Sequence, residues 1–314
     1  MVPAVICQPP GMMGAVKTFI VGGTGLIGSR IAGVLRERGH EVTTVARSRR
    51  SGVDHQLDLE SASIAELRPL LAGHDAVVFA ARTDEQRPLP KPIGPAFRRA
   101  MVDPVVRLFT AAREQGATRG VIMGSYYTYF DRVHPEWKLT AEHAYIRCRV
   151  EQAREARAAA GPGLPIAVLE LPFVLGPKTN WAGPLASWAR SRTPLLAPPG
   201  GTAVASAQTV AEMTADALER SSGEDLPVAD ENLTWQEMFT RIAAASGRPR
   251  TVHRLPGVTV RAATGLGGVL QSLTGKETGL NTGGLARLLL RDLSVEPVTG
   301  HSLDPAFRET FSRP

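Results

Sequence analysis

The first half of the chain alternates between short apolar runs and longer segments with one apolar face. The apolar runs lie at Thr18–Val21, Val42–Val45, Ala76–Ala80, Gly120–Met123 and Ile166–Leu171. They lack strict polar–apolar alternation, which is typical of strands buried on both faces. Helical patterns lie between them, notably at Ala96–Gln115 and Ala141–Ala160. This order predicts an α/β fold, a doubly wound parallel sheet whose ligands bind at the carboxyl ends of its strands.

The pattern changes in residues 178–314. Proline and glycine become frequent, as in residues 194–201, and helical patterns at Ala207–Glu219 and Trp235–Ala245 are separated by short strands. The stretch Gly265–Gly284 is rich in glycine but has no fixed period, so it indicates no internal repeat. We expect this half to form a smaller C-terminal α/β domain that binds the substrate, with some elements returning to the main sheet.

Three glycines follow the first strand, and a helical pattern begins directly after them. Gly22 allows a tight turn, Gly25 lets phosphates approach the main chain, and Gly28 lets the helix pack closely on its strand. The helix N-terminus then offers N–H groups to a pyrophosphate. An ordinary strand–turn–helix is the alternative. We expect residues 17–177 to form a Rossmann-type dinucleotide-binding domain. Its first turn holds these cofactor-binding candidates: Gly22, Thr24, Gly25, Leu26, Ile27 and Gly28.

The end of the second strand indicates which nicotinamide cofactor binds. At this place an acid would bond the ribose 2′-hydroxyl of NAD, whereas an arginine would suit the 2′-phosphate of NADP. The chain has Arg47 there, followed by Arg49 and Arg50, and the first acid is Asp54. The sequence therefore favours NADP over NAD, with a solvated basic turn as the alternative. Asp58, after a short third strand, could accept a bond from the adenine amino group or cap the next helix.

Composition narrows the class of protein. The 314 residues carry a formal net charge of +6, but the basic residues are scattered and no aromatic platform accompanies them, which argues against nucleic-acid binding. No stretch approaches the ~18 apolar residues of a membrane span, and no cluster has metal-ligand spacing. Two cysteines, Cys7 and Cys148, are too few for a disulfide framework and indicate a reducing, cytoplasmic setting. Residues 1–16 lack a signal-peptide pattern and are expected to be a disordered leader.

The tyrosines cluster after the strand at Gly120–Met123. All four lie within twenty residues, at Tyr126, Tyr127, Tyr129 and Tyr145. Tyr145 and Arg149 are four residues apart on a predicted helix, so a phenol and a guanidinium would stand side by side. Ser125, at the end of the strand, is placed to bond the same substrate oxygen. The alternatives are that the first three tyrosines pack beneath the C-terminal domain, and that Tyr145 and Arg149 form a solvated pair.

These motifs and four further segments carry a family resemblance. They are the glycine loop at 22–28, Ala80 and Ala81, Ser125, Tyr145 with Arg149, Leu171–Pro177, Ser206–Ala211 and Glu231–Trp235. Together they cover most of residues 17–250. On these residues the chain resembles the short-chain dehydrogenase/reductase superfamily, in its extended or atypical branch, the NAD-dependent epimerase/dehydratase family.

The resemblance implies a role for each matching residue. Tyr145 would be the general acid or base, Ser125 would orient and polarise the substrate oxygen, and Arg149 would be the cation that supports them. Hydride would pass between NADP or NAD and a secondary alcohol or ketone. The matching segments add these cofactor-binding candidates: Ala80, Ala81, Pro172 and Val174. The candidates for the substrate pocket are Tyr126, Tyr127 and Trp181.

Three positions depart from the family pattern. Arg149 stands where the family has lysine, Met101 where it has asparagine, and Leu171 where many relatives have arginine. The first hypothesis is an NAD(P)-dependent oxidoreductase or epimerase/dehydratase-type enzyme with a small-molecule substrate. The second is a non-catalytic NADP-binding sensor or partner protein. Substrate identity, and the choice among reduction, epimerisation and dehydration, stay open. The helices at Ala96–Gln115 and Ala141–Ala160 could form the face of a homodimer.

Overall fold

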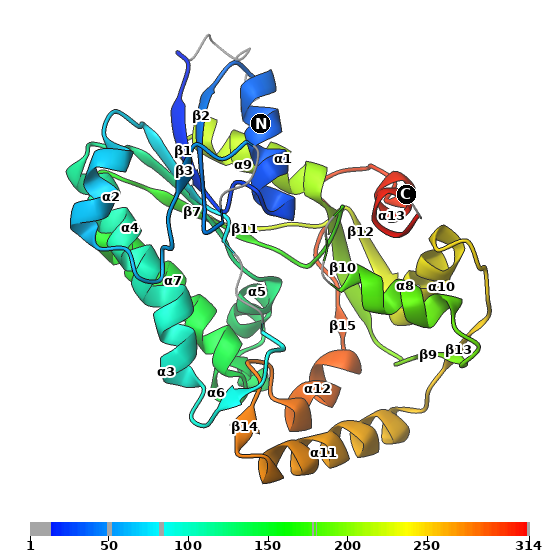
Figure 1. Ribbon diagram of the computed structural model, residues 1–314. Helices are drawn as coiled ribbons and strands as arrows, with labels where there is room; N and C mark the ends of the chain where they lie inside the picture. The colour runs from blue at the N-terminus through cyan, green and yellow to red at the C-terminus, as the bar shows by residue number, and fades with distance from the viewer. Residues whose placement is uncertain (1–13, 49–51, 82–84, 178, 180, 313–314) are drawn as a thin grey trace, which may run out of the picture.

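The structure is a computed structural model that describes residues 14–48, 52–81, 85–177, 179 and 181–312 (Figure 1). Its centre is a seven-stranded parallel sheet in the order β3-β2-β1-β4-β6-β7-β11. The strands are β1 (Lys17–Val21), β2 (Glu41–Ala46), β3 (His55–Gln56), β4 (Ala76–Phe79), β6 (Arg119–Met123), β7 (Ile166–Glu170) and β11 (Asp225–Pro227). Residues 1–13 of the expected leader, with Cys7 among them, and also Arg49 and Arg50, lie outside the described residues.

Helices cover both faces of this sheet, because successive residues of a strand point to opposite sides. Ile20 of β1 packs in one apolar cluster with α1 and α9, whereas Phe19 packs in another with α2, α4 and α7. Figure 1 shows the last three helices along one side of the sheet. The doubly wound α/β fold predicted from the sequence is confirmed. The five helices are α1 (Leu26–Glu37), α2 (Ile64–Leu71), α4 (Asp103–Glu114), α7 (Ala144–Ala160) and α9 (Ala207–Glu219).

The C-terminal half adds a second sheet in the order β12-β10-β15, with β8 beside β10. Three helices pack with this sheet around a core that contains Trp235 and Phe307. The strands are β8 (Phe173–Leu175), β10 (Gly201–Ser206), β12 (Glu231–Thr234) and β15 (Asp292–Leu293). The helices are α8 (Ala182–Arg190), α10 (Trp235–Ala245) and α13 (Asp304–Phe311). Two short strand pairs complete this half: β9 (Leu195–Ala197) with β13 (Val252–Arg254), and β5 (Leu89–Pro90) with β14 (Lys276–Glu277).

The helix predicted at Ala96–Gln115 is divided in the structure. It consists of α3 (Gly94–Phe97), a π-helical turn η1 (Arg98–Val102) and α4. Pro104, at the start of α4, has no N–H to donate, so a regular α-helical ladder cannot run through this point. The turn packs directly against α7. This irregularity therefore lies beside the helix that carries Tyr145.

The helix predicted at Ala141–Ala160 is also divided. His143 has an extended backbone, with φ of −124° and ψ of 110°, and separates α6 (Leu139–Glu142) from α7. Two further helical segments, α5 (Tyr126–Val133) and the 3₁₀ turn η2 (Pro135–Trp137), fill the space between β6 and α6. The tyrosines that follow β6 in sequence are therefore on a helix of their own.

The glycine-rich stretch at Gly265–Gly284 overlaps a long helix. This is α11 (Gly257–Leu273), and it is followed by the 3₁₀ turn η3 (Thr282–Gly284) and α12 (Leu285–Leu289). Glycine lowers helix propensity, but tertiary packing overrides propensity where a helix has a close neighbour, and α11 packs on η3. None of the helices in the described ranges is long and apolar enough to cross a bilayer.

Candidate active site

The glycine loop joins β1 to α1 through contacts that leave no room for side chains. Gly22 has a φ of +86°, and a Cβ there would lie 2.8 Å from the carbonyl carbon of Ala80. A Cβ on Gly28 would lie 2.3 Å from the carbonyl oxygen of Gly22, and one on Gly25 would lie 3.2 Å from the same atom. Bare backbone therefore lines the carboxyl end of β1.

The start of α1 is open to an anion. Gly25 is the N-cap, it offers no side-chain bond, and the first turn holds no acidic residue. The first three N–H groups of the helix, those of Leu26, Ile27 and Gly28, have no intrahelical partner. Thr24 is half-buried in the turn just before them. Free N–H groups beside a bare glycine turn suit a diphosphate, so the residues present fit NAD(P).

The other cofactor candidates lie at the same end of the sheet. They are Ala80, Ala81, Pro172 and Val174. The first two directly follow β4 and lie next to Gly22. Val174, in β8, packs in the apolar cluster that includes Leu26. A Cβ on Gly176 would lie 2.5 Å from Cδ1 of Leu26, so the segment after β8 closes on the start of α1.

At the end of β2, Arg47 is exposed, whereas the nearest acid, Asp54, is already hydrogen-bonded to Thr44. Asp54 accepts hydrogen bonds from the N–H of Thr44 at 2.7 Å and from its Oγ1 at 2.8 Å, and these bonds hold the pKa of Asp54 below its ordinary value. Arg47 lies exposed just beyond β2. Asp58 is exposed and accepts the N–H two residues further along at 3.2 Å. Ser63 caps α2, so the predicted alternative of Asp58 as the helix cap is wrong.

α7 brings Tyr145 and Arg149 together, as their spacing predicts. Nε of Arg149 donates to Oη of Tyr145 at 3.2 Å, and both residues are only 7% exposed, so the alternative of a solvated pair is wrong. Nη1 of Arg149 also donates to the carbonyl oxygen of Met123 at 2.9 Å. Because Met123 is the last residue of β6, the guanidinium ties the phenol of Tyr145 to the carboxyl end of the central sheet.

Gln152 completes the polar group on α7. Its Oε1 accepts a second bond from Nη1 of Arg149 at 2.8 Å, and its Nε2 donates to the carbonyl oxygen of Met101 at 2.6 Å. Gln152 is 1% exposed, and Met101 belongs to the π-helical turn η1. The partners of Arg149 among the described residues are thus three uncharged groups, so a nearly buried cation stands beside the phenol of Tyr145.

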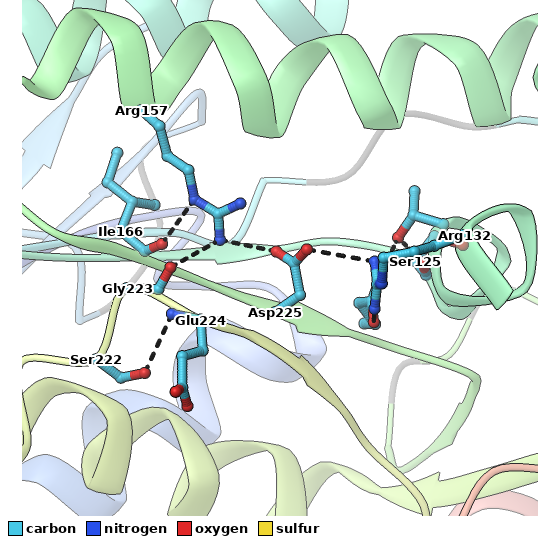
Figure 2. A network of polar contacts seen from close by, with 10 residues as sticks. Ser125, Arg132, Arg157, Ile166, Ser222, Gly223, Glu224 and Asp225 are labelled. Atoms are coloured by element: carbon cyan, nitrogen blue, oxygen red, sulfur yellow. Dashed lines mark hydrogen bonds and ion pairs between the residues drawn. The ribbon is translucent and has the colours of Figure 1, made fainter.

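Ser125 follows β6 and is 4% exposed, with its Oγ bonded to no group in the described part of the chain. Its carbonyl oxygen lies 2.7 Å from Oγ1 of Thr128. The same Oγ1 lies 2.6 Å from Glu170, a buried carboxylate that Arg132 binds at 2.8 Å. Figure 2 shows this network continuing from Arg132 to Asp225 on β11. The end of β6 is therefore braced against β7 and β11.

Two tyrosines of α5 lie directly after Ser125. Oη of Tyr126 lies 3.0 Å from Oγ1 of Thr202, and burial raises the pKa of Tyr126 to about 12. The ring of Tyr127 lies 4.6 Å from that of Tyr126, and burial raises the pKa of Tyr127 well above its ordinary value. Both phenols therefore stay protonated at neutral pH. They pack in the same apolar cluster as Tyr145.

The structure does not bring Trp181 to this cluster. Its ring lies 5.8 Å from the ring of Phe173 and 5.8 Å from that of Phe311, and all three residues pack in the core of the C-terminal half. Tyr129 of α5 does pack against the cluster of Tyr145, as a partly buried residue whose ring lies 5.2 Å from that of Phe130. Of the substrate candidates, Tyr126 and Tyr127 are therefore the two that the fold places near Tyr145.

A C-terminal segment covers the start of α7. The N–H of Tyr145 donates to the carbonyl oxygen of Gly279 at 2.9 Å, and the N–H of Asn281 donates to Nδ1 of His143 at 3.0 Å. His143 is fully buried, and burial lowers its pKa to about 4. Its Nε2 has no partner among the described atoms. His143 therefore belongs to the structure that holds α7 rather than to a solvated proton path.

Sequence reasoning missed Gln152 and the part played by the Met101 carbonyl. Gln152 lies three residues after Arg149 and seven after Tyr145, so all three share one helix face, and this spacing was a readable signal. The Met101 contact joins residues 51 positions apart and has no such signal. Within the described ranges, no group of three or more His, Cys, Asp and Glu residues could hold a metal ion.

A family model described as NAD(P)H-binding matches residues 22–178, from Gly22 of the glycine loop to just beyond β8. The match covers half of the chain, and the chain therefore belongs to this NAD(P)H-binding family. The dinucleotide predicted from the glycine loop is confirmed at this level, as NAD(P). A comparison with curated protein sequences gives no significant match.

Several solved structures share the fold. The protein gox2253 aligns with a TM-score of 0.72 and 21% identity, covering 95% of this chain and 97% of that one. UDP-N-acetylglucosamine 4-epimerase from Bacillus cereus gives 0.65 and 17%, with 95% and 98% covered. The human epimerase family protein SDR39U1 (isoform 2), solved with NADPH, gives 0.64 and 19%, with 94% and 99% covered. These similarities confirm the fold of the extended short-chain dehydrogenase/reductases.

Proposed function

We propose that the chain is an NAD(P)-dependent oxidoreductase or epimerase/dehydratase-type enzyme that acts on a secondary alcohol or ketone. The observation that carries the proposal is the buried pair on α7, in which Arg149 holds Oη of Tyr145 at 3.2 Å and is itself fixed to the end of β6. The glycine loop lies at the carboxyl edge of the same sheet. A positioned phenol beside a dinucleotide site suits a proton transfer coupled to hydride transfer.

Tyr145 moves the proton in this proposal. The bond from Arg149 occupies one lone pair of Oη and fixes the direction of the hydroxyl, which then exchanges its proton with the substrate oxygen. The charge of Arg149 lies beside this hydroxyl, and the described partners of Arg149 carry no negative charge that would cancel it. Ser125, with Oγ free of described partners, donates to the substrate oxygen and polarises it. With NAD(P) bound at the glycine loop, the nicotinamide would supply or accept the hydride.

Gln152 is a positioning residue in this site. A lysine at position 149 would carry its donors on one nitrogen, whereas the guanidinium reaches Tyr145, Met123 and Gln152 at once. Gln152 holds Nη1 from the side and is anchored in turn on the carbonyl of Met101. Two of the three departures from the family pattern, those at Met101 and Arg149, are therefore joined by one buried amide.

Replacement of Tyr145 by phenylalanine tests the proposed acid/base. We expect turnover to fall about 100- to 10,000-fold, because the hydroxyl that moves the proton is lost. The Kd for NADPH should change little, since the phenol is not among the residues proposed to hold the cofactor. Turnover is measured by nicotinamide absorbance with a panel of secondary alcohols, ketones and nucleotide sugars, and Kd by titration of nicotinamide fluorescence.

Tyr129→Phe is the matched control for this experiment, because it removes the same atom from a tyrosine that packs on Phe130 of α5. It should retain native turnover. Gln152→Leu should give an intermediate loss in kcat with an unchanged Kd for NADPH. Native turnover in Tyr145→Phe would refute the assigned role of Tyr145.

We further propose that NADP is preferred over NAD. Arg47 is exposed beyond β2, and the nearest acid, Asp54, is held by Thr44. Arg47→Ala is expected to weaken NADPH binding about 10- to 100-fold, because it removes a charge-assisted bond to the 2′-phosphate, and to leave NADH binding unchanged. Parallel fluorescence titrations with the two cofactors measure both values. Equal weakening of both would refute the preference.

A non-catalytic NADP-binding protein is the second candidate. The observation in its favour is that Nε and Nη1 of Arg149 are both committed to protein groups, namely Tyr145, Met123 and Gln152. Tight NADPH binding with no turnover on any member of the substrate panel would support this candidate. Turnover that disappears in Tyr145→Phe would eliminate it.

A further inference from the structure

α11 has its two faces the opposite way round from an ordinary surface helix, whose apolar side faces the core. Five large aliphatic side chains of α11 are 56–78% exposed: Val258, Leu266, Val269, Leu270 and Leu273. They are the five most exposed large hydrophobic residues in the described part of the chain. Figure 1 shows α11 along one edge of the molecule, with α12 beside it. The apolar side of this helix therefore faces solvent.

The side of α11 that faces the rest of the protein carries small and polar residues, such as Gly268 and Gln271. A Cβ on Gly268 would lie 2.7 Å from Cα of Gly283, so the backbones of α11 and η3 touch. Nε2 of Gln271 donates to Oγ1 of Thr278 at 3.4 Å. Val260 is the one described residue of α11 that is fully buried. The helix is thus fixed by close backbone approach, and its leucines take no part in the core.

The exposed side chains form a regular seam. Ala262, Leu266, Val269 and Leu273 recur at intervals of four, three and four residues, the spacing with which two helices pack against each other. Arg261 is the single charged residue of α11, and the helix has no aromatic residue. A helix that lies in a membrane interface carries Lys and Arg on a free polar face and Trp or Phe on the other. The composition of α11 therefore favours a protein partner.

We propose that the outward face of α11 is a self-association surface, covered by α11 of a second copy in an antiparallel pair. A two-fold interface needs a patch complementary to itself, and an almost uncharged apolar helix meets this condition. The other exposed large aliphatic residues of the described chain are scattered: Val133, Val150, Leu196 and Val298. None of them forms an apolar patch that could cover α11 instead.

The area is sufficient for such a pair. At their exposed fractions the five residues leave roughly 600 Å² accessible per copy, so a pair that covers all of it removes at most ~1,200 Å² from water, the lower end of the range for stable interfaces. The helices predicted from sequence as a dimer face offer much less apolar surface. There Arg98 pairs with Asp103, Glu151 and Glu155, and these ions bridge η1, α4 and α7.

Charge reversal on the seam tests the proposal. The double variant Leu266→Glu/Leu273→Glu and the native chain are compared by sedimentation velocity from nanomolar to micromolar protein. We expect the native chain to dimerise and the variant to dissociate with a Kd at least ~100-fold higher. NADPH binding should persist in the variant, which shows that it is folded. Leu196→Glu, a change at a 40% exposed leucine of β9, is the matched control and should dimerise normally.

Cysteine cross-linking tests the orientation. In a Cys7→Ser background, Leu266→Cys should form a disulfide with its copy, because an antiparallel pair places the middle of each helix at the two-fold axis. Leu273→Cys should cross-link only to Val258→Cys. Cys148 is buried and burial raises its pKa to about 11, so it does not compete.

A native chain that stays monomeric at every concentration would overturn the proposal. In that event the chain is mixed with vesicles of phosphatidylcholine and phosphatidylglycerol. Sedimentation of the native chain with these vesicles, lost in the double variant, would assign the face to a lipid surface instead. A dimer that persists in the double variant would also overturn the proposal, since another surface would then hold it.

Discussion

α1 and α11 both bring a glycine into contact with a neighbouring backbone, but they expose opposite sides. In α1, Gly28 approaches the carbonyl of Gly22 while Ile31 and Leu35 are buried in the core beside it. In α11, Gly268 approaches Gly283 while the leucines point to solvent. In α1 the glycine contact and the buried apolar residues lie on the same side of the helix. In α11 the glycine contact lies on one side and the exposed apolar residues lie on the other. A helix of the second kind is stable in place but leaves apolar surface to be covered.

Among the substitutions that test this comparison between α1 and α11, Gly28→Val should have the largest effect. In Gly28→Val the new Cβ would overlap the carbonyl of Gly22, so α1 must move away from β1. We expect NADPH binding to be lost, with the free energy of unfolding lowered by about 3 kcal/mol. Fluorescence titration and urea unfolding measure the two effects.

Gly33→Ala is the matched control in the same helix, because a Cβ there meets no atom within 4 Å. Alanine at this position should raise the free energy of unfolding by about 0.5–1 kcal/mol, through its higher helix propensity, and leave NADPH binding unchanged. Retention of native affinity by Gly28→Val would contradict the assignment of the glycine loop.

Acid should also lower the stability of the fold, without the loss of cofactor binding expected for Gly28→Val, and it should act on the side of the molecule that carries α11. Burial holds the pKa of His143 at about 4, whereas a histidine in the unfolded chain has a pKa near ~6.5. Between these values the unfolded chain binds a proton that the folded chain does not. The stability contributed by neutral His143 is therefore complete above ~6.5 and is lost as the pH falls towards about 4, by up to ~3 kcal/mol.

His143→Gln, which retains an acceptor for the N–H of Asn281 and does not titrate, is the comparison variant. Urea unfolding at several pH values should give a shallower loss of stability for the variant than for the native chain. Hydrogen exchange should show the acid effect first in residues 278–284, with β1 and α1 protected. Identical pH dependence in the two proteins would show that His143 does not control this segment.

The central sheet was predictable because buried parallel strands are continuous apolar runs. The runs found in the sequence agree with β1, β2, β4, β6 and β7 to within one residue at each end. The glycine loop was predictable for a similar reason, since a positive φ at Gly22 and the contact at Gly28 tolerate no side chain. The contact between Tyr145 and Arg149 was predictable because residues four apart lie on the same face of a helix. In each case the cause is local in the chain.

The remaining features depend on contacts between distant segments. Periodicity identifies the apolar side of α11, but its direction is set by the approach of Gly268 to Gly283. The division at His143 depends on Asn281, 138 residues away. The role of Gln152 likewise depends on a distant segment, because its Nε2 donates to the carbonyl oxygen of Met101 in the π-helical turn η1. Such pairings leave no periodic trace in a single sequence.

The position of α9 has a consequence for synthesis on the ribosome. Ile20, Val78 and Val121 lie in the apolar cluster that α9 completes, and β11 supplies the edge strand beside β7. Both elements come from residues 207–227, well after the strands that they cover and extend. A nascent chain that contains only the first six strands of this sheet therefore exposes to water the apolar surface on which α9 later packs. This surface is covered only after the ribosome has translated the late segment, and exposed surface of this kind is where incompletely folded chains aggregate.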